Sequence, residues 1–140
     1  MKVYIDTSVV LRHLFNETGV WKHWATWDQA YASEVMGVEA RRCIDRLRLT
    51  NALDDEGVAV AHRELTAIEK TINIVACTRV TFQRAALPMP TVVKTLDALH
   101  LAAVSLLRES GTTLVFATHD EKLARAATAL SFEVSGTSSD

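Results

Sequence analysis

The sequence of 140 residues is poor in cysteine and proline, with two of each, and these shortages narrow what the chain can be. Cys43 and Cys77 lie far apart and neither belongs to a CxxC pair, so a zinc–thiolate site is disfavoured and reduced thiols are expected. Both prolines fall in the stretch LPMPT, residues 87–91, which predicts a loop at the rim of a cleft. GxGxxG and GxxxxGK(S/T) motifs are absent, which argues against nucleotide cofactors and P-loop chemistry.

The chain also has no strong excess of either charge and no long apolar run. Its formal net charge of −2 argues against general electrostatic attachment to nucleic acid or to an anionic membrane, so any binding of a polyanion must be local or assisted by a metal ion. No apolar run approaches the roughly 18 to 20 residues of a membrane span, and the start MKVYID reaches a charge too soon for a signal peptide. We therefore expect a cytoplasmic protein that does not contact a membrane.

Strand-like and helical segments alternate along the chain, which is typical of a single α/β domain. Strand character is found at residues 2–5, 30–32, 72–76, 113–117 and 132–134, and helical periodicity at 8–16, 20–29, 34–49, 55–71, 79–86, 96–109 and 120–129. We predict a domain over residues 1–134 and a polar tail, residues 135–140, that frays. The sheet of such a domain is mostly parallel, here with about five strands between helices, and ligands bind beyond the carboxyl ends of the strands.

Three aspartates stand where a helix follows a strand or a loop. Asp6 comes directly after KVYI, Asp120 follows TLVFATH, and Asp97 lies near the start of the helix TLDALHLAAVSLL. Glu39, beside the apolar face of the helix over residues 34–49, is a fourth candidate. Clustered carboxylates demand a cation, and hard oxygen ligands suit Mg²⁺ or Mn²⁺, which can activate a water for attack on a phosphodiester. The pattern therefore indicates metal-assisted phosphodiester hydrolysis.

Each of these acids also has a purely structural interpretation. Asp97 and Asp120 can complement the dipole of the helix that follows, and Asp6 can cap the helix beside it. Glu39 can pair with Arg42 on the helix surface. For any single residue the structural interpretation is the stronger one. The metal-site hypothesis depends on an aspartate recurring at three separate junctions.

Four motifs, in their order and spacing, resemble those of the PIN-domain ribonucleases, especially the VapC-type toxins of toxin–antitoxin pairs. The motifs are YIDTSVVLRHL, SEVMGVEARR, LDALHLAA and FATHDEKLARAA, and they span nearly the whole chain. The resemblance implies a PIN-like three-layer domain with a site for Mg²⁺ or Mn²⁺ made of Asp6, Glu39, Asp97 and Asp120. It also implies supporting hydroxyl groups from Thr7, Ser8 or Thr118.

The same resemblance implies an endoribonuclease that is restrained by a cognate VapB-type antitoxin, and we expect a homodimer. Asp6, Asp97 and Asp120 would position the principal ion, and Glu39 would bind a second ion or orient water. The chain departs from the family in the tryptophan-rich segment GVWKHWATWDQA and in His119, which stands directly before the last acid. These departures bear on the packing of the second predicted helix and on the surroundings of the metal.

Aromatic and histidine residues near the motifs invite functional hypotheses as well. Trp21, Trp24 and Trp27 recur every three residues, which would place them on one stripe of a helix over residues 20–29. We expect this stripe to pack in the core or against another chain rather than to stack on RNA bases. His100, one turn after Asp97, is expected to be a hydrogen-bonded core residue rather than a base or a metal ligand.

Arg42 and Arg46 share a helix face with Glu39. They can steer an RNA phosphate toward the acids, or they can form surface salt bridges with Asp45. The sequence favours neither interpretation over the other.

Other functional classes fit the motifs less well. An aspartyl-phosphate phosphatase needs a second acid two residues after Asp6, where Ser8 stands, and a receiver domain needs an aspartate after the third strand, which INIVACT lacks. The main alternative is a non-catalytic module of the same fold that binds RNA or protein. Stabilisation by Mg²⁺ or Mn²⁺ would distinguish the enzyme from this module.

Overall fold

Five parallel strands form one sheet at the centre of the molecule, in the order β3-β2-β1-β4-β5. They are β1 (Lys2–Ile5), β2 (Gln29–Ser33), β3 (Asn73–Val75), β4 (Val115–Ala117) and β5 (Glu133–Ser135). The structure is a computed structural model and describes residues 1–138. The chain runs outward from β1 to β3 and then returns to the other side of β1 for β4 and β5, so a topological switch point lies between β1 and β4.

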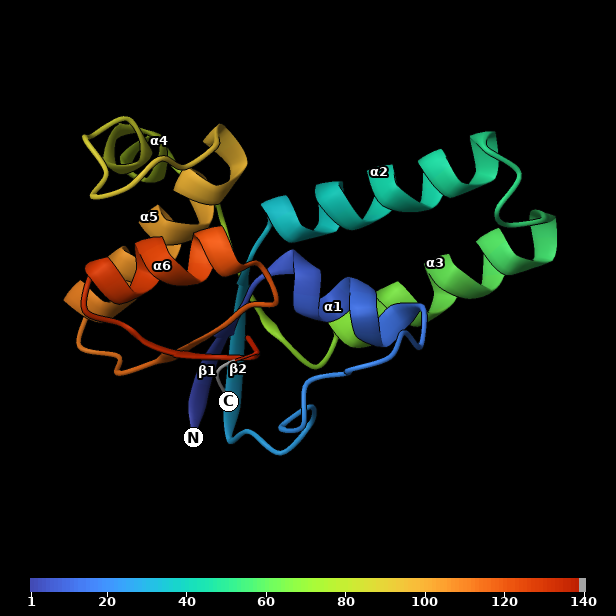
Figure 1. Ribbon diagram of the computed structural model, residues 1–140, viewed down its shortest axis with the longest axis horizontal. Coiled ribbons are helices and arrows are strands. Elements are labelled where there is room, and N and C mark those ends of the chain that lie inside the picture. The colour runs from blue at the N-terminus through green and yellow to red at the C-terminus, as the bar shows by residue number, and fades with distance from the viewer. Residues whose placement is uncertain (139–140) are drawn as a thin grey trace.

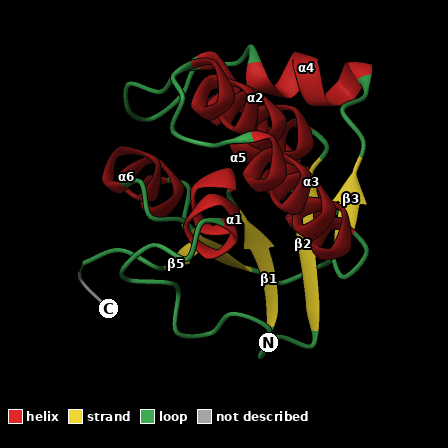
Figure 2. Cartoon of the chain, turned by 90° about the vertical axis from the view of Figure 1, so that its right-hand side faces the viewer, coloured by secondary structure: helices red, strands yellow, loops and turns green. Residues whose placement is uncertain are grey.

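Six helices of the described range cover both faces of this sheet (Figures 1 and 2). On one face lie α1 (Thr7–Leu14), α2 (Val35–Leu49) and α3 (Asp55–Glu69), and on the other lie α5 (Thr95–Glu109) and α6 (Glu121–Ala129), with α4 (Arg79–Ala85) packed against α5. In Figure 1, α2 and α3 extend to the right as a pair, whereas α4, α5 and α6 lie on the left. This arrangement confirms the predicted three-layer α/β fold.

The central strand β1 is buried on both faces. Its side chains alternate, as in any strand: Val3 and Ile5 join the core beneath α1, α2 and α3, and Tyr4 joins the core beneath α5 and α6. The Tyr4 ring stacks on Phe116 of β4, with ring centroids 5.4 Å apart. Because β1 is held from both sides, the residue that follows it, Asp6, has a well-determined position.

Most predicted elements are present, with ends shifted by a few residues. At two helix starts the cap is a polar side chain: Asp54 caps α3 by accepting from the Gly57 amide, and Thr78 and Thr81 form a capping box at α4. Two residues that also suit an N-cap by type, Ser33 and Thr95, lie one residue from the observed caps, Glu34 and Lys94. None of the helices within residues 1–138 combines the length and the apolar character that a membrane crossing requires.

The predicted helix over residues 20–29 is wrong. Two short turns occupy the segment, in which the Trp24 amide donates to the Trp21 carbonyl and the Thr26 amide donates to the His23 carbonyl. Ala25 has a φ of 61°, a left-handed conformation that an α-helix cannot contain. The segment therefore reverses the chain between α1 and β2 without forming a helix.

The three tryptophans nevertheless pack in the core, as expected. Trp21 is buried and its indole N–H donates to Ser135 Oγ at 2.9 Å, and Trp24 and Trp27 pack against the core beneath α1. The rings of Trp24 and Trp27 meet edge to face at 5.2 Å, and the His13 ring stacks on Trp24 at 3.9 Å. Burial of large aromatic rings is favourable in any backbone geometry, so the three-residue spacing did not require a helix.

The end of the chain makes more contacts than a frayed tail would. Ser135 belongs to β5, which therefore extends past the predicted domain boundary at residue 134. The Ser138 hydroxyl donates to Glu121 Oε1 at 2.7 Å, which holds the chain against the start of α6. Residues 139–140 of the predicted tail lie outside the described residues.

Candidate active site

All four predicted acids line one pocket of about 690 Å³ at the carboxyl edge of the sheet. Asp6 follows β1, Glu39 lies on α2, Asp97 lies in the first turn of α5, and Asp120 precedes α6. Parallel strands deliver the residues after them to the same edge of a sheet, which explains how distant segments of the chain meet here. Four separate segments of the chain thus contribute one carboxylate each.

Asp6 and Asp120 are placed by the neighbouring strands β1 and β4. The Asp6 amide donates to the Ala117 carbonyl at 2.9 Å, which continues the parallel pairing of these strands. Each aspartate also caps the helix that follows: Asp6 accepts from the Ser8 amide at 3.3 Å, and Asp120 Oδ1 accepts from two amides of α6 at 2.8 and 3.1 Å. Helix capping and a place in the pocket are therefore compatible, and the structure contains both.

Hydroxyl groups hold two of the acids. Asp6 Oδ2 accepts from Ser8 Oγ at 2.6 Å and from Thr118 Oγ1 at 3.0 Å, while Thr7 Oγ1 donates to Glu39 Oε1 at 2.8 Å. Asp6, Thr7 and Thr118 are buried, so these bonds form in a region of low dielectric where they restrain the side chains strongly. The three candidate hydroxyl residues thus all lie against the acids.

Negative charge in the pocket is only partly neutralised. Burial raises the pKa of Asp97, and the carboxylates of Asp6, Asp120 and Glu39 raise it further, against a smaller opposite effect of His100. A carboxyl group keeps its proton more readily when it is buried and when like charges surround it, so the raised pKa reflects burial first and repulsion by the other acids second. A pocket with this property attracts cations.

Glu39 contacts a buried histidine instead of Arg42. Its Oε1 lies 2.6 Å from His100 Nε2, and His100 Nδ1 lies 2.9 Å from the hydroxyl oxygen of Tyr4. His100 is 0% exposed, as expected for a core residue, yet its Nε2 also lies 3.6 Å from Asp6 Oδ1. His100 is therefore both a core residue and a neighbour of two of the acids.

The surroundings of His100 and Tyr4 shift both of their pKa values. Burial alone lowers the pKa of His100, but the hydrogen bond to Glu39 and the charge of Asp6 outweigh it and raise this pKa. Burial, followed by the charge of Asp6, raises the pKa of Tyr4 well above its usual value, so the hydroxyl keeps its proton. Sequence analysis missed Tyr4: alternation along KVYI separates it from Val3 and Ile5, but no local signal pairs it with a histidine so far along the chain.

The two arginines border the pocket from α2. Arg42 donates to Asp45 Oδ2 at 3.0 Å, which is one of the salt bridges considered from the sequence, whereas Arg46 contacts Cys43 Sγ at 3.6 Å. Asp45 pairs with Arg48 as well. Exposed ion pairs such as Arg42–Asp45 contribute little to stability, so a phosphate can compete for the Arg42 guanidinium group.

His119 is directed away from the acids. Its Nδ1 lies 2.6 Å from the Gly136 carbonyl oxygen, and its amide donates to Ser8 Oγ at 3.0 Å. Gly136 has a φ of 103°, and a side chain there would meet the Thr118 carbonyl, so glycine permits this close passage of the chain. His119 does not line the acidic pocket.

The donor set of the acidic pocket suits a hard divalent cation, although the carboxylates do not yet have the geometry of a coordination site. Carboxylate oxygens are the ligands that Mg²⁺ and Mn²⁺ prefer. Within residues 1–138, no three or more His, Cys, Asp or Glu side chains already form a group that could hold a metal ion. The residue types fit the ion, and binding requires the carboxylates to turn toward it.

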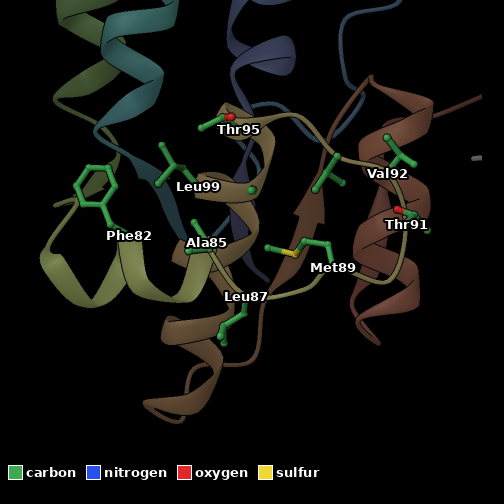
Figure 3. Close-up of a pocket in the computed structure, with 11 residues that line it drawn as sticks. Phe82, Ala85, Leu87, Met89, Thr91, Val92, Thr95 and Leu99 are labelled. Carbon is green, nitrogen blue, oxygen red and sulfur yellow. The ribbon is translucent and has the colours of Figure 1, made fainter.

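A second pocket, of about 530 Å³, lies beside the same helix α5 and is apolar (Figure 3). Phe82 and Ala85 of α4, Met89 of the connecting loop and Leu99 of α5 surround it, and no charged side chain lines it. The proline loop, predicted to form the rim of a cleft, borders this apolar pocket and not the acidic one.

Comparison with known proteins gives a match to the PIN domain family over residues 3–129. No curated protein matches the sequence at a significant level. The fold is similar to chains in three solved structures. A toxin–antitoxin complex from Klebsiella pneumoniae has 19% identity and a TM-score of 0.64, covering 87% of this chain and 90% of the other.

VapBC2 from Rickettsia felis, bound to a DNA fragment from its promoter, has 9% identity and a TM-score of 0.65, and the match covers 96% of this chain and 97% of the other. FitAB bound to an IR36 DNA fragment has 15% identity and a TM-score of 0.69, covering 96% and 93%. At these identities the likeness shows the fold. Because the family match extends over residues 3–129, the chain belongs to the PIN domain family.

Proposed function

We propose that this PIN domain is a Mg²⁺- or Mn²⁺-dependent endoribonuclease toxin of the VapC type that acts on RNA in the cytoplasm and is inhibited by a cognate VapB-type antitoxin. The observation that carries the proposal is the meeting of four acids from four segments in one pocket. Family membership supports nuclease chemistry, and the likeness in fold to chains of toxin–antitoxin complexes supports the toxin class.

In the proposed reaction Asp6, Asp97 and Asp120 would hold the principal ion, and Glu39 would bind a second ion or orient the attacking water. A bound divalent ion lowers the pKa of a water and offsets charge on the phosphate. The hydroxyls of Ser8 and Thr118 restrain Asp6, so less side-chain freedom is lost when the site is loaded. In-line attack of water on phosphorus with departure of the 3′ oxygen leaves a 5′-phosphate end.

The proposed RNA contact is local. Arg42 and Arg46 stand on the α2 wall of the acidic pocket, where guanidinium groups can bind phosphates on either side of the cleaved bond. A chain with a net charge of −2 has no general attraction for RNA, so these two side chains and the bound cation supply it.

Inhibition is proposed to occur by occlusion of the same pocket. Val38, Leu49 and Leu96 on its walls are 63%, 62% and 46% exposed, and an antitoxin segment that buried them would also cover the acids. The proposal includes a homodimer, which sedimentation analysis of the free chain tests.

The decisive experiment compares Asp6→Asn with Asp54→Asn. Both aspartates cap a helix and asparagine preserves a capping oxygen, but only Asp6 lies in the pocket. We expect Mn²⁺ to raise the melting temperature of the wild type and of Asp54→Asn, and to leave Asp6→Asn unchanged. RNA cleavage with 5′-phosphate ends, read by end sequencing, should be lost only in Asp6→Asn. RNA binding that needs no metal and gives no cleavage would favour the non-catalytic module instead.

A further inference from the structure

A chain of hydrogen bonds lies beneath the acidic pocket and links four elements of the fold. The Ser33 amide at the end of β2 donates to the Tyr4 hydroxyl oxygen at 3.2 Å, and this hydroxyl lies 2.9 Å from His100 Nδ1. His100 Nε2 then lies 2.6 Å from Glu39 Oε1. Tyr4 and His100 are both 0% exposed, so water cannot replace these contacts.

The donors and acceptors in this chain determine where the protons lie. The Tyr4 hydroxyl accepts from the Ser33 amide and has one proton to donate, for which His100 Nδ1 is the neighbour. Glu39 as a carboxylate only accepts, so His100 Nε2 must carry a proton. Nε2 is protonated both in the neutral ring with this tautomer and in the charged ring. The opposite neutral tautomer would set two lone pairs against each other at 2.6 Å.

Glu39 depends on side-chain contacts more than Asp6 and Asp120 do. Asp6 and Asp120 accept hydrogen bonds from backbone amides at the helix starts. Within residues 1–138, the hydrogen bonds of the Glu39 carboxylate come from two side chains, the Thr7 hydroxyl and the His100 ring, and both reach Oε1. A glutamate side chain has more rotatable bonds than an aspartate, so it needs such restraints to be held in one position.

We propose that His100 is a positioning residue: Tyr4 holds its ring in place, and its protonated Nε2 holds the Glu39 carboxylate at a defined distance from Asp6. His100 Nε2 also lies 3.6 Å from Asp6 Oδ1, so the ring lies between the carboxylates of Glu39 and Asp6. This inference rests on the proposed function, because Glu39 is placed for the sake of a metal ion or a water. Outer contacts of this kind typically change metal affinity by about 10- to 100-fold.

The test uses the full chain and measures Mn²⁺ affinity by calorimetry alongside RNA cleavage. We expect His100→Leu to weaken Mn²⁺ binding by about 10- to 100-fold and His100→Gln, whose amide can still donate to Glu39, to recover most of it. Tyr4→Phe should weaken binding by about 10-fold, at the lower end of that range. Tyr31→Phe is the matched control, since the exposed Tyr31 hydroxyl donates to Gln29 Oε1 and Tyr31 does not line the acidic pocket.

Wild-type Mn²⁺ affinity and cleavage in Tyr4→Phe and in His100→Leu would overturn the inference, as would equal losses in His100→Gln and His100→Leu. Should His100→Leu fail to fold, Tyr4→Phe against Tyr31→Phe decides the matter. Long-range ¹H–¹⁵N spectra of the metal-free wild type read the protonation of His100 directly, and an unprotonated Nε2 would also overturn it. A wild type that neither binds Mn²⁺ nor cleaves RNA refutes the proposed function. In that case the spectra still test whether His100 Nε2 carries the proton that the hydrogen bond to Glu39 requires.

Discussion

The two pockets beside α5 differ in chemistry although they share a helix. Leu96 and Asp97 line the acidic pocket, whereas Ala98 and Leu99, the next residues along the helix, line the apolar one. The apolar pocket contains no charged side chain, so nothing in it opposes folding beyond incomplete packing. The acidic pocket brings together carboxylates that repel one another, as the raised pKa of Asp97 indicates.

This difference indicates that the acidic pocket is kept for a reason other than stability. Like charges that are partly buried lower stability unless a ligand compensates for them, and such groups gather at functional sites. The hydroxyls and helix starts around Asp6 and Asp120 lower the cost without removing the repulsion. The apolar pocket needs no such support, because its lining contains no charges that repel one another.

The largest expected effect comes from placing a carboxylate in each pocket. Leu99 is 6% exposed and Leu96 is 46% exposed on the same helix. Leu99→Asp would bury an anion among apolar groups and should lower the free energy of unfolding by about 3 kcal/mol or more. Leu96→Asp should lower it by less than about 1 kcal/mol, because water still reaches that side chain. Urea denaturation measures both, and equal losses would contradict the contrast between the pockets.

A smaller effect is expected from substitution of the two arginines that line the acidic pocket. Arg42→Ala and Arg46→Ala should each weaken RNA binding several-fold and lower the slope of log K against log salt by about 0.7, the value for one phosphate contact to a single strand. Arg84→Ala is the control, since Arg84 lies on α4, lines neither of the two pockets and pairs with Glu109. Filter binding measures the affinity, and all variants carry Asp6→Asn as well so that the RNA is not cleaved during the measurement. An equal change in slope for all three variants would exclude a specific role for the α2 wall.

The smallest expected effect is a gain in stability from Asp97→Asn without metal. The folded pKa of Asp97 is raised, so at neutral pH the folded state carries repulsion that the unfolded state lacks. Removing the charge should raise the free energy of unfolding by less than about 1 kcal/mol, since the side chain is partly exposed.

The sign of the pH dependence follows from proton binding. As pH falls through the raised pKa toward the ordinary value of 3.8, the folded wild type takes up the proton before the unfolded chain does. The wild type therefore gains stability relative to Asp97→Asn in that window, and the difference between the two closes. Thermal unfolding across pH measures it, and a difference independent of pH would show that charge is not the cause.

The elements around the acids were accessible to sequence analysis because their signals are local. Asp54 and Thr78 are of residue types that favour a helix N-cap, and the alternation in KVYI indicates a strand. The placement of Asp6 and Asp120 at one edge of the sheet follows once β1 and β4 are parallel neighbours. Local rules failed at residues 20–29, where packing of the tryptophans and a left-handed Ala25 override the helical spacing.

The contacts that orient the acids could not be derived in the same way. The structural alternative for Glu39 was a pair with Arg42, three residues along its own helix, but its carboxylate contacts Thr7 and His100 from other elements. A neighbour on the same helix is always within reach, whereas a contact between distant segments depends on how whole elements pack. Tyr4 was missed for the same reason.

The amino-acid sequence by itself determined the parallel α/β class and most helix starts, because periodicity and capping are properties of short stretches of chain, and it singled out four acids as candidates. Only the tertiary structure decided that the acids share a pocket, which hydroxyl holds which carboxylate, and that a buried histidine stands between Glu39 and Asp6. Those outcomes depend on burial and on distances between segments far apart in the chain, and these exist only once the layers have packed.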